Sequence, residues 1–94
     1  MANYTITLTD TETKSLEYVA VSNQDWIDNA AKNRARIAKE EIISLNTAHC
    51  NKNGIAIAVG EDAQVTQAYT LGIVKTAAVR NAEAEAAAEA AAAA

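Results

Sequence analysis

The longest patterned stretch of the chain covers residues 23–51, where apolar residues recur at the spacing of an α-helix. At about 100° per residue, one face of this helix is apolar and the opposite face is polar. The apolar stripe consists of Ile27, Ala31, Ala35, Ala38, Ile42, Leu45 and His49. Ser22, followed three residues later by Asp25, predicts the helix start, because a hydroxyl can accept a hydrogen bond from a free first-turn amide. Asn53 and Gly54 predict its end, since both readily adopt the left-handed conformation.

The segment before this helix alternates between apolar and polar residues in the manner of β-strands. One alternating run covers residues 4–9 and a second covers residues 16–21, with a polar connection at residues 10–14. This connection has the length of a hairpin loop, although it lacks glycine. We therefore expect an N-terminal β-hairpin that packs on the long amphipathic helix. The face left outward, open to solvent or to a strand from a neighbouring chain, consists of Thr5, Thr7 and Thr9.

The segment after the long helix predicts a short extended stretch and then two helical segments. Residues 55–59 alternate isoleucine or valine with alanine, which is typical of extended backbone. A helix is expected over residues 61–71, a break at Gly72 because glycine disfavours helix interiors, and a further helix from Ile73 onward. The predicted fold class is α+β, with one domain over residues 1–81. Residues 82–94 are expected to form an Ala/Glu-rich helical or frayed tail.

Composition suggests that a single copy has a thin core. Half of the 94 residues count as hydrophobic, but alanine dominates, phenylalanine is absent, and tryptophan and methionine occur once each. Alanine buries little area, and a domain of this size buries a limited fraction of its surface. A monomer should therefore be marginally stable, and burial against copies of itself would relieve the deficit.

The charge pattern of the chain argues against nucleic acid as a partner. The formal net charge is −4, and the basic residues of the long helix are balanced by acidic ones, unlike the clustered basic face of a nucleic-acid-binding domain. Arg34 and Glu41 interrupt the apolar arc of the helix, and either reach water from its margin or meet charges on another subunit. The candidate subunit-interface residues are Thr5, Thr7, Thr9, Arg34, Glu41, Ile43, Val74 and Ala78.

Candidate chemistry is sparse. His49 and Cys50 are adjacent, whereas zinc ligands are separated by two to four residues and number four in all. Neighbouring helical residues also point about 100° apart, which disfavours a nucleophile and base pair. Gly54, Gly60 and Gly72 form no phosphate-binding motif. We expect no catalytic residues, no metal, no cofactor and no enzymatic activity.

The chain also lacks the marks of export and membrane insertion. Its first residues contain neither a basic region nor an apolar run, and no stretch approaches about 18 consecutive large apolar residues. The lone Cys50 cannot form an internal disulfide. We expect a soluble protein, made in the cytoplasm, without a membrane partner.

Several segments resemble a group of small, functionally uncharacterised proteins encoded among the virion genes of tailed phages. The similarity spans most of residues 4–81, without a diagnostic catalytic motif. It is carried by residues 4–10 (YTITLTD), 16–21 (LEYVAV), 24–30 (QDWIDNA), 33–38 (NRARIA) and 72–78 (GIVKTAA). The resemblance implies a virion-associated or self-assembling structural role.

Two functional hypotheses follow. The first is a non-enzymatic structural protein that assembles with copies of itself, as a virion component or as a filament or shell subunit, alongside other virion proteins. The second is a small adaptor that holds a different protein through an exposed strand edge. Self-association of the purified chain separates the two hypotheses.

Overall fold

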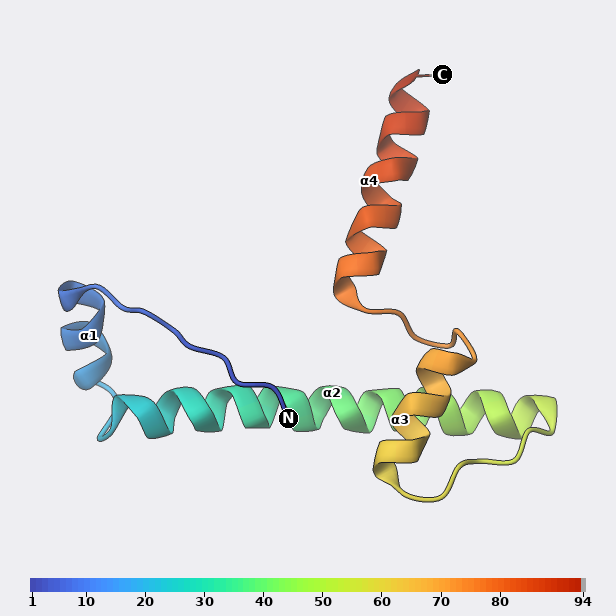
Figure 1. Ribbon diagram of the computed structural model, residues 1–94, viewed down its shortest axis with the longest axis horizontal. Coiled ribbons are helices and arrows are strands. Elements are labelled where there is room, and N and C mark those ends of the chain that lie inside the picture. The colour runs from blue at the N-terminus through green and yellow to red at the C-terminus, as the bar shows by residue number, and fades with distance from the viewer. Residues whose placement is uncertain (94) are drawn as a thin grey trace. The chain divides into compact units, whose positions relative to one another are not determined.

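The computed structural model describes residues 1–93, and this range contains four helices connected by irregular segments (Figure 1). The helices are α1 (Asp10–Glu17), α2 (Asn23–Asn53), α3 (Glu61–Thr70) and α4 (Ala77–Ala93). The chain forms two compact units, Met1–Ile37 and Ala38–Ala94. The boundary between them lies within α2, so this helix contributes to both units.

The predicted α+β fold class is wrong, because residues 1–93 contain no β-strand. Helix α1 replaces the expected hairpin connection and the start of the second strand. The cause is local: the hydroxyl of Thr9 accepts a hydrogen bond from the amide of Glu12 at 3.2 Å, and the Glu12 carboxylate accepts one from the Thr9 amide at 3.0 Å. This reciprocal capping box satisfies two free amides and starts a helix. Without glycine, the connection offers no competing hairpin turn.

The expected boundaries of the long helix are confirmed to within two residues. Helix α2 begins at Asn23, and the hydroxyl of Ser22 accepts a hydrogen bond from the amide of Asp25 at 3.3 Å. At the other end, Gly54 has a φ of 64°, and the amide of Ile55 donates to the carbonyl of Cys50 at 2.9 Å. This backbone bond closes the last turn around a left-handed residue, as in a Schellman motif.

The C-terminal unit packs α3 and the connection at residues 55–60 against the end of α2. The fully buried residues among those described are Asn46, Cys50 and Ala68. Helix α3 ends at Thr70, and the turn after it contains Gly72, whose φ is 71°. The amide of Ile73 donates to the carbonyl of Ala68 at 3.0 Å. Residues 73–76 are not helical, so the expected return to helix at Ile73 is wrong by four residues.

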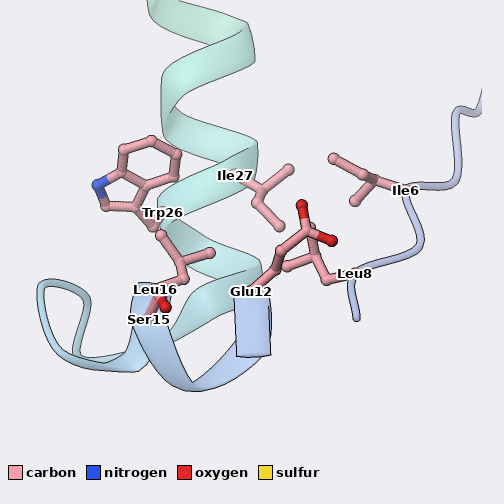
Figure 2. A pocket seen from close by; sticks show the side chains of 7 residues that line it. All are labelled: Ile6, Leu8, Glu12, Ser15, Leu16, Trp26 and Ile27. Carbon is pink, nitrogen blue, oxygen red and sulfur yellow. The ribbon is translucent and has the colours of Figure 1, made fainter. Parts of the chain in front are cut away.

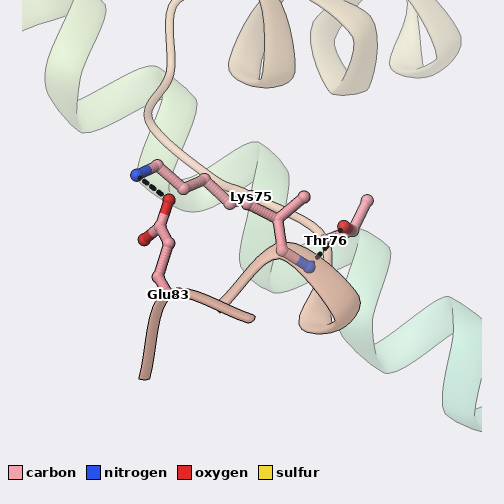
Figure 3. A network of polar contacts seen from close by, with 4 residues as sticks. Lys75, Thr76 and Glu83 are labelled. Carbon is pink, nitrogen blue, oxygen red and sulfur yellow. Dashed lines mark hydrogen bonds and ion pairs between the residues drawn. The ribbon is translucent and has the colours of Figure 1, made fainter. Parts of the chain in front are cut away.

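Helix α4 starts after Thr76, whose hydroxyl accepts a hydrogen bond from the amide of Val79 at 3.2 Å. Lys75 forms an ion pair with Glu83 at 2.8 Å (Figure 3). The helix includes residues 82–93 of the expected tail, and all of its described residues are exposed. Ala94 lies outside the described residues. No helix within residues 1–93 combines the length and apolar character needed to cross a bilayer.

Candidate assembly surface

The N-terminal unit carries an open apolar hollow of about 420 Å³ beside the start of α2 (Figure 2). Its lining combines side chains from the segment before α1, from α1 and from the first turns of α2. The lining residues are Ile6, Leu8, Glu12, Ser15, Leu16, Trp26 and Ile27. The side-chain Nδ2 of Asn23 donates to the carbonyl of Thr13 at 3.4 Å, which joins α1 to the start of α2. Because most of the lining side chains are apolar, the hollow can accept an apolar side chain.

The aromatic side chains of the N-terminal unit are exposed. Tyr4 is 93% exposed, Tyr18 is 90% exposed and Trp26 is 49% exposed. The prediction that the tyrosines pack on the long helix is wrong, because the hairpin that would hold them there does not form. Trp26 does lie beside Leu16 in the hollow (Figure 2). The N-terminal unit therefore leaves its aromatic residues available for contact.

The electrostatics of the hollow are set by Glu12 at its rim. The backbone amide of Thr9 donates to the Glu12 carboxylate, and the Thr9 hydroxyl adds a further hydrogen bond. Both interactions favour the charged carboxylate and lower the pKa of Glu12 below its ordinary value. One edge of the apolar hollow therefore carries a fixed negative charge.

A polar cluster lies at the centre of the C-terminal unit. The buried Asn46 donates from Nδ2 to Oε1 of Gln67 at 3.0 Å. The thiol of buried Cys50 lies 3.8 Å from both Asn46 Oδ1 and Gln67 Oε1. Buried polar groups are costly unless they are paired, so this pairing lets α2 and α3 pack on an asparagine instead of a large apolar residue.

The same Gln67 side chain holds the segment at residues 55–58, before the bend that begins at Val59. Its Oε1 accepts a hydrogen bond from the amide of Ala58 at 3.0 Å, and its Nε2 donates to the carbonyl of Ala56 at 2.9 Å. The carboxamide thus pairs with the segment as a peptide group of a neighbouring strand would. Beyond this contact, Val59 is 94% exposed. The backbone of the segment is therefore hydrogen-bonded along one edge only, at Ala56 and Ala58.

The structure divides the sequence-predicted interface residues between the two units. In the N-terminal unit, Thr5, Thr7 and Arg34 are exposed, and Thr9 caps α1. In the C-terminal unit, Glu41 and Ala78 are exposed and Ile43 and Val74 are half-buried. The two charges are solvent-facing, and whether they contact another subunit stays a prediction.

Sequence reasoning missed the residues with the most informative geometry. The alternation at residues 55–59 indicated extended backbone, but Gln67 carried no local signal because its partners come from two other segments, α2 and the connection. His49 is half-buried and Cys50 is fully buried at the end of α2. No group of three or more potential metal ligands occurs within residues 1–93.

Comparisons with protein-family models, with curated proteins and with solved structures find no match to this chain. The resemblance to phage virion proteins therefore stays a prediction from the sequence.

Proposed function

We propose that this chain is a non-enzymatic structural protein that functions by assembling with copies of itself, as a virion-associated component or as a filament or shell subunit. The observation that carries the proposal is the exposure of large apolar side chains on both units. Tyr4 and Tyr18 on the first unit and Val59 on the second are nearly as exposed as in an unfolded chain. Each unit therefore leaves large apolar side chains that contact with another copy would cover.

Sedimentation velocity of the purified chain at increasing micromolar concentrations tests the proposal. We expect species heavier than 9.9 kDa that grow with concentration. Trp26 gives a second signal, because it is the single tryptophan and lines the open hollow. Its emission should shift to shorter wavelength as neighbouring copies exclude water. A 9.9 kDa monomer with unchanged emission at every concentration would contradict the proposal.

A matched pair of variants on or beside α1 separates specific contact from a general effect of charge. Tyr18→Lys replaces an exposed aromatic residue and should weaken assembly. Thr11→Lys adds the same charge at an exposed α1 position and should leave assembly close to that of the unmodified chain. Equal effects of both substitutions would show that charge, and not the aromatic surface, controls association.

The adaptor of the second hypothesis cannot use a β-strand edge, because residues 1–93 contain no strand. An adaptor could instead use the apolar hollow to receive a side chain of a different protein. Its five apolar lining residues and its acidic rim at Glu12 favour an apolar residue flanked by a basic one. The two proposals differ in one measurement, because an adaptor stays monomeric alone and binds its partner at a fixed stoichiometry.

A further inference from the structure

The extended segment at residues 55–58 has one backbone edge paired and the other free. Gln67 binds the carbonyl of Ala56 and the amide of Ala58, so these groups point to the same side. In extended backbone, the groups of the intervening residue point to the opposite side. The amide and carbonyl of Ile57 have no hydrogen-bond partner within the part of the chain that the structure describes. The Gln67 contact therefore presents Ile57 as a preformed pairing edge.

We propose that residues 55–59 of two copies pair antiparallel about a two-fold axis at Ile57, forming a small bridge between subunits. This inference rests on the proposed function and names the contact through which two copies meet. Ile57 of each copy donates its amide to the carbonyl of Ile57 of the partner subunit and accepts the reciprocal bond. Such a contact is self-complementary, which is the condition for a two-fold interface.

The side chains of the segment support this pairing. Ile55 and Ile57 share one face because alternate residues of extended backbone point the same way, and Val59 follows where the chain bends toward α3. In the proposed register, Val59 lies opposite Ile55 of the partner subunit. Val59 is 94% exposed in the single chain, and this cross-strand contact would cover it.

Charges on either side of the segment favour the antiparallel direction. The last turn of α2 before it carries Lys52, and the first turn of α3 after it carries Asp62 and Glu61, of which Glu61 already pairs with Lys39 of its own chain at 3.3 Å. Antiparallel pairing brings the basic end of one copy toward the acidic end of the other. Parallel pairing would instead place like charges together, which is unfavourable. A second copy of this chain therefore supplies the complementary edge, the apolar face and the opposite charges at once.

Disulfide trapping tests the register with two single-cysteine additions. In Ile57→Cys, the two introduced residues face each other with Cα atoms about 5.5 Å apart, within the range of about 4.4–6.8 Å that a disulfide requires. In the control Val59→Cys, the corresponding residues are four positions apart along the bridge, at about 13 Å, beyond disulfide reach. The buried native Cys50 is present in both variants.

Under mild oxidation of the full-length chain, we expect most of Ile57→Cys to become a covalent dimer and Val59→Cys to stay largely uncross-linked. Equal cross-linking of both variants, or no cross-linking of Ile57→Cys in a sample that sediments as an assembly, overturns the bridge and leaves the proposed function standing. A wild-type chain that never associates overturns both.

A second trap keeps the proposal testable if Ile57→Cys fails to fold, as judged by circular dichroism. Ala56 of one copy lies opposite Ala58 of the partner subunit in this register. A mixture of Ala56→Cys chains and Ala58→Cys chains should therefore cross-link to each other more than either cross-links alone. Cross-linking in the mixture no stronger than in the separate samples overturns the bridge.

Discussion

At the scale of single residues, short hydrogen bonds decide where helices begin. The Thr9 hydroxyl and the Glu12 carboxylate satisfy each other's backbone amides, at 3.2 Å and 3.0 Å. Because these bonds span three residues, they form before any long-range contact is needed. They convert a stretch that otherwise alternates like a strand into the first turn of α1. Thr9, an interface candidate from its sequence pattern, thus has a demonstrated role as a cap.

This cap makes α1 sensitive to acid. Hydrogen bonds to the charged carboxylate lower the pKa of Glu12 in the folded chain below its value in the unfolded chain. The carboxylate therefore contributes to stability above its unfolded pKa, and this contribution is lost as pH falls through the lower folded pKa. Carbon-detected NMR titration of the Glu12 carboxyl should show a midpoint below that of unfolded glutamate.

Thr9→Ala is the matched control, because it removes the hydroxyl and weakens the capping box without changing any charge. We expect the Glu12 midpoint to move up toward its unfolded value in this variant. An identical midpoint with and without the hydroxyl would show that the cap does not control the titration.

At the scale of elements, one side chain joins three segments of the C-terminal unit. Gln67 on α3 bonds to Asn46 on α2 and to the backbone of Ala56 and Ala58 in the connection. The carboxamide uses both its donor and its acceptor, and Asn46 is fully buried. The extended shape of residues 55–58 therefore depends on α3 more than on its own β-branched residues.

Gln67→Leu should destabilise the chain by about 2 kcal/mol, because a buried asparagine donor loses its partner and the connection loses both of its bonds. Gln64→Leu is the control on the same helix, since Gln64 makes no side-chain hydrogen bond in the structure, and should cost less than about 0.5 kcal/mol. Urea unfolding followed by circular dichroism measures both. Similar losses in the two variants would refute the role given to Gln67.

At the scale of the whole molecule, the balance between buried and exposed apolar residues favours association. Within residues 1–93, the fully buried residues are small or polar, whereas several large apolar residues are exposed. A chain with such a small core gains little from folding alone. Stability should then depend on contacts with neighbouring copies.

The melting temperature should consequently rise with protein concentration, because partner binding stabilises the folded state by mass action. Differential scanning calorimetry over about a hundredfold range of concentration measures this rise, expected to be several degrees. If dilution restores the lower melting temperature, the rise is reversible and was not caused by chemical modification of the chain. A melting temperature independent of concentration would indicate a self-sufficient monomer.

The sequence alone determined the features that depend on neighbouring residues. Ser22 and Asp25 marked the start of α2, Asn53 and Gly54 marked its end, and Gly72 marked the end of α3, each confirmed by a backbone bond or a positive φ. The capping box at Thr9 was present in the sequence too, but the alternation around it gave a competing prediction of a hairpin. The hairpin prediction failed because a segment of alternating apolar and polar residues forms a stable strand only when a second strand pairs with it.

The tertiary structure decided the features that need distant residues to meet. Asn46, Ala58 and Gln67 are separated by up to 21 positions, and no local pattern indicates that one carboxamide will join them. The structure also decided which apolar residues stay exposed, since helical periodicity places a residue on a face without saying whether anything packs there. Helix caps involve residues three or four positions apart, so a local sequence pattern can predict them. Burial of side chains and hydrogen bonds between segments depend on residues that only folding brings together.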